Sequence, residues 1–282
     1  MADEKLTKLR ELPVRKNNLL IQKARYKLTA KQFDIITYVV SMVKPQDTPG
    51  TMYSFSIKDF CMLLGIDYRN GWHYRSVKDE LQHLADKSIW VPTEDGKERL
   101  TRWFDDVMID RGNGTIEVSF HKSIWQYIYE VRKQFTQYPA SHSYALSSKY
   151  SKYIYDFLKS WQGQGSITVS LEDFIKYDCP CPYTQYKNLR QKVLDVAVEE
   201  INKLTDIKVS YEPIKIKSRS YTHLCFRIKS ASETEKMLHA TGRFLALATD
   251  KEMAEFLELE GEEEYRQTRD TNVENDDDEL PF

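Results

Sequence analysis

The sequence predicts an α+β fold, with two tandem winged helix-turn-helix domains followed by a disordered acidic tail. Two observations lead to this prediction, an internal repeat and an uneven division of charge along the 282 residues. The repeat is Ser56–Phe60, which returns in similar form as Ser170–Phe174, 114 positions later. Each copy follows a short strand-like run and opens a helix with a serine in the capping position. Around each copy the order is helix, strand, helix, helix, hairpin, which is typical of a winged helix-turn-helix.

In the first copy, apolar residues that recur every three to four positions predict an opening helix. A strand and a short helix follow, and the short helix ends at Gly65. After a longer helix the pattern changes to strands, which turn at Gly112–Gly114. The predicted elements are helices over 29–43, 57–64 and 74–87 and strands over 52–55, 89–91, 101–110 and 115–120.

The second copy shows the same succession, with helices over 147–161, 170–174 and onward, and 183–204, and strands over 167–169, 207–217 and 221–229. Between the copies, His121–Gln134 predicts a linking helix, and the break at Tyr138–Ala140 puts a boundary near Pro139. The predicted organisation is an N-terminal arm over 1–27, a first winged helix for dimerisation and auxiliary DNA contact over 28–138, a second as main DNA reader over 139–230, and a helical segment with acidic tail over 231–282.

The net charge of −2 conceals two opposed parts of the chain. Residues 250–282 contain 14 acidic and 3 basic residues, a net charge of −11. Subtracting these from the totals of 43 and 41 leaves 29 acids and 38 bases in residues 1–249, a net charge of +9. A basic body is typical of a nucleic-acid binder, although the total charge argues against one.

Several function classes are disfavoured by what the sequence lacks. No apolar run approaches the roughly 18 residues of a membrane span and Met1–Arg10 has no signal-peptide core, so we expect a cytoplasmic protein. The four cysteines suit neither a disulfide framework nor a zinc site, and there is no phosphate-binding loop. We therefore expect no cofactor, no metal and no catalytic residue; a nucleophilic tyrosine among the 18 is the untested exception.

The helix over 183–204 has the strongest DNA-binding pattern. Leu189, Val193, Val196, Ala197, Ile201 and Leu204 form its predicted apolar face. The opposite face carries amide, hydroxyl and ammonium groups, which can pair with base edges in a major groove. Arg190 projects about 50° from the apolar stripe and is expected to pair with a carboxylate rather than touch DNA. The predicted contacts on this helix are Thr184, Lys187, Asn188, Gln191 and Lys192.

The hairpin loop at 215–220 offers three cations for phosphate contacts, from Lys215, Lys217 and Arg219. The first copy has a less coherent set of polar groups in the comparable place, which predicts a weaker DNA role. Its members are Arg69, Asn70, His73, Arg75 and Lys78, with Tyr74 beside them.

Two motifs resemble the iteron-binding plasmid replication initiators of the Rep3 family. The first is Val14–Ile21, followed by Ala24–Tyr26 and Leu28–Thr29. The second runs from Asn188 to Asn202 and continues as Thr205–Ile207 and Cys225–Lys229. The resemblance covers about residues 12–230, and it adds Arg15 and Lys16 to the predicted DNA contacts.

The resemblance implies tandem winged helices that bind repeated origin sequences as double-stranded DNA, with the second domain as main reader. It also implies monomers that start replication, homodimers that often repress their own gene, and contacts with the host initiator ATPase and replicative helicase. We place dimerisation on the first domain, with Leu6, Leu9 and Leu12 or the linking helix as candidates. Two recognition helices about one DNA turn apart should cover roughly 20 base pairs.

The tail ends in Asp276–Phe282, an acidic run followed by Leu-Pro-Phe. It is similar to the C-terminal tip of bacterial single-stranded DNA-binding proteins, which docks into basic, apolar pockets of replication enzymes. We predict partner contacts from Asp276, Asp277, Asp278, Leu280, Pro281 and Phe282. Competition of the tail with DNA for the basic body, or simple solubilisation, remain the alternatives.

Other classes of protein use the same pattern. A winged-helix transcriptional repressor without an initiator role would share the DNA-reading residues, and a winged-helix protein-interaction module would form no sequence-specific DNA complex. The DNA beside the gene distinguishes the first two, because direct repeats favour an initiator and a lone inverted repeat favours a repressor.

Overall fold

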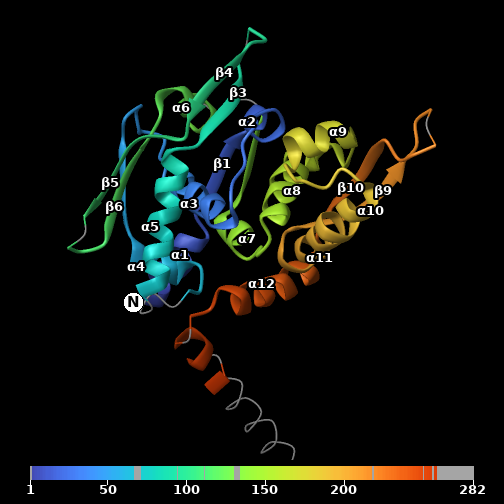
Figure 1. Ribbon diagram of the computed structural model, residues 1–282. Coiled ribbons are helices and arrows are strands. Elements are labelled where there is room, and N and C mark those ends of the chain that lie inside the picture. Colours follow the sequence, from blue (N-terminus) through green and yellow to red (C-terminus); the bar gives the residue numbers. More distant parts are fainter. Residues whose placement is uncertain are drawn as a thin grey trace, which may run out of the picture.

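The computed structural model describes residues 2–66, 71–93, 95–110, 112–129, 134–217, 219–249, 251–255 and 257–258. Two units of mixed helix and sheet lie side by side, and a C-terminal helix runs from the second unit toward the first (Figure 1). Within these ranges no helix is both long enough and apolar enough to cross a membrane.

The first unit contains the predicted elements and adds a strand and a short helix at its start and a second hairpin. A helix, α1 (Ala2–Arg10), precedes it. Its elements are β1 (Pro13–Asn17), α2 (Asn18–Gln22), α3 (Ala30–Ser41), β2 (Met52–Ser56), α4 (Ile57–Leu63), α5 (Gly71–Ala85), β3 (Ser88–Pro92), β4 (Glu98–Arg102), β5 (Phe104–Asp110), β6 (Thr115–Phe120) and α6 (Lys122–Ile128).

The second unit follows the same succession without the extra hairpin. Its elements are β7 (Phe135–Pro139), α7 (Ala140–Tyr144), α8 (Lys149–Ser160), the 3-10 turn η1 (Gln162–Gln164), β8 (Ser166–Ser170), α9 (Leu171–Asp173), the π-helical η2 (Phe174–Asp178), α10 (Tyr186–Leu189), the π-helical η3 (Arg190–Leu194), α11 (Asp195–Leu204), β9 (Ile207–Ile214) and β10 (His223–Ser230). Helix α12 (Glu233–Leu247) comes last.

The two units have one topology. Each has a three-stranded antiparallel sheet in which the first strand pairs with the last strand of the wing hairpin, in the orders β2-β6-β5 and β8-β10-β9. Ser56 and Ser170 cap α4 and α9 in the same way, because each hydroxyl accepts a hydrogen bond from a backbone N–H three residues later, at Asp59 and Asp173. The predicted duplication and both winged helices are confirmed.

Equivalent aromatic pairs form the centre of each unit. Tyr38 of α3 lies 5.8 Å from Phe60 of α4, and Phe157 of α8 lies 6.2 Å from Phe174, between ring centroids. All four side chains are buried. Burying a large apolar side chain contributes on the order of 1.5–3 kcal/mol, so these pairs hold each helix-turn-helix onto its opening helix.

Strands β1 and β7 pair with each other and join the two units. The pairing is antiparallel, with Arg15 opposite Gln137 at its centre and Pro13 opposite Pro139 at one end. Because the two strands occupy equivalent places at the start of each unit, antiparallel pairing sets the units in opposite orientations. Accordingly, the β5–β6 and β9–β10 wings extend in opposite directions in Figure 1.

The helix that forms is shorter than the linking helix predicted over His121–Gln134. His121 is the N-cap of α6, whose last residue is Ile128, and the chain is already extended in β7 from Phe135. The hydrogen bonds between β7 and β1 join residues that are more than a hundred positions apart in the sequence, so local periodicity gives no sign of them. The strand predicted over 101–110 is also divided. Its first two residues belong to β4 (Glu98–Arg102), which pairs with β3, and the wing strand β5 begins at Phe104.

Two buried ion pairs lie at the junction of the units. Lys152 Nζ of α8 lies 2.6 Å from Asp34 Oδ1 of α3, and Lys16 Nζ of β1 lies 2.7 Å from Asp156 Oδ2 of α8. Burial raises the pKa of the Asp34 carboxyl to about 6, against the opposing effect of the Lys152 charge.

The boundary between the two domains, which the sequence predicts near Pro139, stays a prediction.

Candidate nucleic-acid interface

The second recognition helix is built from α10, η3 and α11, and it begins at Tyr186 rather than at Tyr183. Thr184 therefore lies in the turn that leads into the helix, where its side chain is exposed. The side chains predicted to meet DNA from this helix are all exposed: Lys187, Asn188, Gln191 and Lys192. Amide and ammonium groups are thus gathered at the leading half of the helix, where winged helices enter a major groove.

A π-helical turn at Arg190–Leu194 changes which residues face the core. Leu189, Val193, Ala197 and Ile201 are buried as predicted, but Val196 is 41% exposed and Leu194 is fully buried. A π turn closes on the fifth residue instead of the fourth, which accounts for the departure of Leu194 and Val196 from the positions that 100° per residue predicts. The prediction for Val196 is therefore wrong, whereas Gln191 and Lys192 within the π turn are exposed.

A hydrogen-bonded bracket connects this helix to its wing. Arg190 Nε donates to Asp195 Oδ2 at 3.2 Å, and the Tyr211 hydroxyl of β9 donates to the other oxygen of that carboxylate. The predicted carboxylate partner of Arg190 is confirmed. Asn202 acts in the same way farther along, because its amide both donates to and accepts from the backbone of Val209, at 2.9 and 2.7 Å.

The tip of the second wing presents cations beside the start of the recognition helix. Lys215, Lys217 and Arg219 are all exposed. The Tyr221 ring lies 4.7 Å from the Tyr186 ring of α10, and Lys215 Nζ lies 5.0 Å from the centroid of Tyr221. These contacts place Lys215 of the wing beside the start of the recognition helix.

The first recognition helix, α5, presents a smaller set. Arg75 is exposed and Lys78 is half-buried, while His73 Nδ1 is buried and makes no hydrogen bond among the described parts of the chain. Trp72 was not predicted, yet its side chain is 62% exposed beside Arg75. Arg69 and Asn70 lie outside the described residues.

The two recognition helices share a second internal repeat, weaker than the one at Ser56–Phe60 and not among the predictions from the sequence. Tyr74–Lys78 reads Tyr-Arg-Ser-Val-Lys and Tyr186–Arg190 reads Tyr-Lys-Asn-Leu-Arg, 112 positions apart. Both tyrosines contact their wing, since the Tyr74 ring packs on the turn at Gly114 as Tyr186 packs on Tyr221. By this correspondence Arg75 occupies the place of Lys187.

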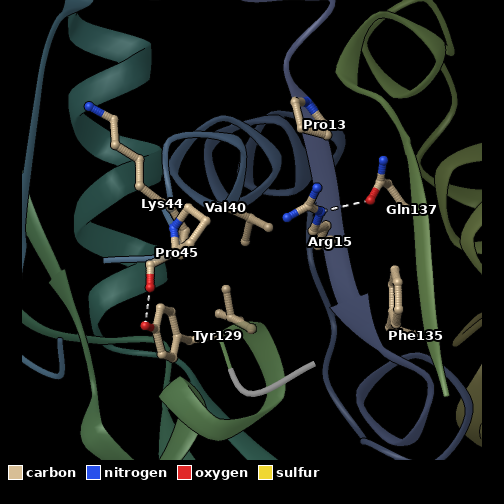
Figure 2. Close-up of a pocket in the computed structure, with 10 residues that line it drawn as sticks. Pro13, Arg15, Val40, Lys44, Pro45, Tyr129, Phe135 and Gln137 are labelled. Atoms are coloured by element: carbon tan, nitrogen blue, oxygen red, sulfur yellow. Dashed lines mark hydrogen bonds between the residues drawn. The ribbon is translucent and has the colours of Figure 1, made fainter. Parts of the chain in front are cut away.

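Arg15 and Lys16 are neighbours on β1, so their side chains point to opposite faces of the strand, one exposed and one buried. Arg15 is exposed on one side of a cavity of about 760 Å³, where its Nε donates to Gln137 Oε1 at 2.7 Å (Figure 2). Lys16 points to the other side and is only 3% exposed, in its ion pair with Asp156. A buried, paired ammonium cannot reach a phosphate, so the prediction that Lys16 contacts DNA is wrong.

Other predictions concern the two ends of the chain. Leu6 is buried, so it is not available as a dimer contact, and Leu9 is partly buried against the hydrophobic core. The predicted partner contacts Asp276–Phe282 lie outside the described residues. In the part of the chain that the structure does describe, no group of three or more His, Cys, Asp or Glu side chains could hold a metal ion.

Two family models match this chain in succession. Residues 13–159 match the model of the initiator replication protein WH1 domain, and residues 170–228 match that of the initiator Rep protein WH2 domain. Together they cover well over half of the 282 residues.

This chain is a member of the Rep3 family of initiator replication proteins. The resemblance drawn from the two sequence motifs is thereby confirmed, and the two winged helices of the structure are the family's WH1 and WH2. The matched residues begin at Pro13 and end at Ile228, so α1 and α12 lie outside both models.

Individual relatives of this Rep3 protein are distant. An uncharacterized 27.6 kDa protein of Escherichia coli is 22% identical over 217 residues, covering 72% of this chain and 90% of the relative. The crystal structure of the Pi initiator protein in complex with iteron DNA matches with a TM-score of 0.65 at 17% identity. That match covers 79% of this chain and 99% of the Pi chain, and at this identity it supports the fold alone.

Proposed function

We propose that this protein initiates plasmid replication by binding repeated origin sequences as double-stranded DNA. Its recognition helices α5 and α10–α11 would enter successive major grooves, and the wing cations would contact the phosphates between them. The observation that carries the proposal is the exposed amide and ammonium set at the start of α10, with Lys215 of the wing beside it, in a chain of the Rep3 family. The structural relative bound to iteron DNA supports the same kind of target.

Within this complex the two units have different tasks. The second unit reads base edges through Asn188 and Gln191, whose amides can pair bidentately with adenine, and through Lys187. The first unit offers fewer polar groups on its recognition helix, where Arg75 and Lys78 are the arginine and lysine of α5, and it serves mainly to fix orientation and register. No step of this function needs catalysis, and a nicking assay on a supercoiled origin plasmid tests that absence.

The direct test uses the full-length protein and the DNA that flanks its gene. Hydroxyl-radical footprinting should protect repeats of roughly 20 base pairs, with two protected grooves on one face of the duplex. Affinity for such a repeat should exceed that for a scrambled duplex by about 10³-fold or more and should fall steeply with salt. Equal affinity for both duplexes, or protection of one groove only, would contradict the proposal.

The resemblance to the family also suggests partners, which we include in the proposal. Dimers of this protein would repress its own gene, and monomers would contact the host initiator ATPase and replicative helicase. Residues 276–282 would bind enzymes that recognise the tip of single-stranded DNA-binding proteins, because their charge and apolar end have the same chemistry. Deleting Leu280–Phe282 should reduce replication in cells without changing origin binding, and unchanged replication would contradict that part.

A further inference from the structure

The segment that follows the second winged helix lies outside the family models and connects the two units. It consists of α12 together with Ala248, Thr249, Lys251 and Glu252, and we call it the strap. It leaves the second unit after β10 and runs toward α1 and α4 (Figure 1). Each of its ends contacts a helix-turn-helix.

The first end of the strap caps the second recognition helix. His239 Nδ1 donates to the carbonyl oxygen of Thr205 at 2.6 Å, and Arg243 Nη1 donates to that of Leu204 at 3.0 Å. These carbonyls are among the last of α11, which have no partner within the helix. Gly242 lets the two helices approach closely, since a Cβ there would lie 3.3 Å from Leu204 Cδ2.

The other end of the strap is fixed to the turn of the first helix-turn-helix through Arg10 of α1. Arg10 and Glu252 are each 7% exposed, with Arg10 Nη1 lying 3.1 Å from Glu252 Oε1. The same guanidinium donates to the backbone carbonyls of Met62, Leu63 and Leu247. One side chain thus binds the end of α4 and the strap together.

The backbones also meet at this point. Gly65, in the turn between α4 and α5, has a φ of +67°, and a Cβ on it would lie 2.8 Å from the carbonyl oxygen of Leu247. Only glycine therefore fits the turn without moving the strap. The strap is seated on the turn that leads to the first recognition helix.

We infer that the strap acts together with the β1–β7 pairing and the buried ion pairs at the junction to set the spacing between the two recognition helices, and that Arg10 is the positioning residue that holds the strap. The inference rests on the proposed DNA binding, and it concerns which separation of the two half-sites the protein accepts. When two binding modules are joined rigidly, the second binds at high effective concentration only at one separation, whereas a looser joint accepts several. Closing the strap onto the Met62–Gly65 turn makes the joint more rigid.

The test compares wild-type protein with full-length Arg10→Ala on a footprinted origin repeat and on the same duplex with 2 base pairs inserted between the two contacted grooves. Such an insertion moves the second groove by ~7 Å and rotates it by ~70°. Wild-type affinity should fall about tenfold or more on the altered duplex, and Arg10→Ala should reduce this discrimination by about threefold while binding the native repeat somewhat more weakly.

Matched variants separate positioning from folding. Lys8→Ala removes an exposed charge that pairs with Glu4 on the same helix, and it should keep the wild-type spacing preference. Glu252→Gln keeps a hydrogen-bond acceptor and removes the charge, so it should relax the preference in the same direction if Arg10→Ala does not fold. Backbone amide hydrogen exchange at Leu63–Ile66 should accelerate in both Arg10→Ala and Glu252→Gln.

The outcomes distinguish this inference from the proposed function. If wild-type protein binds no duplex specifically, the proposed function fails. If wild-type protein discriminates between the two spacings and folded Arg10→Ala and Glu252→Gln discriminate equally well, the proposed function stands and the role of the strap is overturned.

Discussion

Lys152 and Asp34 show what single residues contribute at the junction of the two units. They come from equivalent helices, α8 and α3, and their charges lie 2.6 Å apart with little exposure. The Lys152 ammonium also donates to the carbonyl of Ser143, at 2.6 Å. A pair like this fixes one relative placement of the helices, because any other placement leaves a charge buried without a partner.

Replacing Lys152 by Met should lower the free energy of unfolding by about 3–5 kcal/mol, because it leaves the Asp34 carboxylate buried alone. The measurement is urea denaturation at several pH values above about 6, the wild-type pKa of Asp34. Removing the Lys152 charge raises the pKa of Asp34 further, so the loss should grow with pH until the carboxyl is ionised in the variant as well. Lys203→Met removes an exposed partner of Glu199 and should cost no more than about 0.5 kcal/mol. Similar losses for both variants would mean that burial of the pair is unimportant.

Asp178 is a buried carboxyl at the end of η2, directly before the turn of the second helix-turn-helix. Burial raises its pKa to about 8, although the charge of Lys23 acts in the opposite direction. The folded protein therefore holds a proton that the unfolded chain releases above pH ~4, so stability from this group falls as the pH rises toward 8.

Asp178→Asn should remove that dependence. Its stability relative to wild type should increase between pH 5 and 8, by at most roughly 1.4 kcal/mol per pH unit, and level off above pH 8. Thermal denaturation across this range measures the difference. Glu172→Gln, an exposed carboxylate of the same segment, should follow the wild-type curve, and a constant offset between Asp178→Asn and wild type would contradict the assigned protonation.

At the scale of elements, we expect the second recognition helix to read bases and its wing to bind phosphates. Asn188 and Gln191 point amides outward from the helix, and Lys215 and Lys217 carry charges on the wing. The bracket of Arg190, Asp195 and Tyr211 holds helix and wing together. Base reading and phosphate binding should therefore respond separately to mutation.

Asn188→Ala and Gln191→Ala should each reduce discrimination against altered base pairs by about 1–3 kcal/mol and leave the salt dependence unchanged. Competition binding with single base-pair variants of the repeat gives this value. Lys203→Ala, at the far end of the same helix, is the control. Uniform weakening on all sequences would assign these amides to phosphates instead.

Lys215→Ala and Lys217→Ala should weaken binding to every duplex alike and reduce the slope of log affinity against log salt by about 1 each. The slope is obtained from titrations at several salt concentrations. A variant that loses sequence preference with an unchanged slope would show that the wing reads bases.

The whole molecule combines a basic body with an acidic end. Residues 259–282 contain 10 acidic and 2 basic residues, a net charge of −8. The strap fixes Glu252, which precedes this segment in the sequence, beside the turn of the first helix-turn-helix through Arg10. A negative segment in the same chain as this basic body should repel DNA phosphates or compete with them for the basic body.

Removing residues 259–282 should tighten binding to the repeat severalfold at ~50 mM salt and much less at ~300 mM, because the Debye length shortens as salt rises. Fluorescence anisotropy at the two salt concentrations measures the change. A truncated protein with wild-type affinity at low salt would leave partner binding, rather than competition with DNA, as the role of the tail.

Much of the fold and part of the site follow from local sequence. The Ser56 and Ser170 caps, the helix periodicity and the turn residues act over a few positions, so they predict both winged helices and the exposed polar groups of the second recognition helix. Lys16 shows the limit of such inference. A basic residue in a family motif looks like a DNA contact until the fold brings Asp156, 140 positions away, against it.

By itself, the sequence determined the family, the duplicated winged helices and the separation of a +9 body from a −11 tail, since each depends on residue type and short spacing. Only the tertiary structure decided the β1–β7 pairing, the π turn that exposes Val196, the burial of Lys16 and the seat of the strap on Gly65. These features arise from contacts between residues distant in sequence or from packing against them, and no local pattern encodes such contacts.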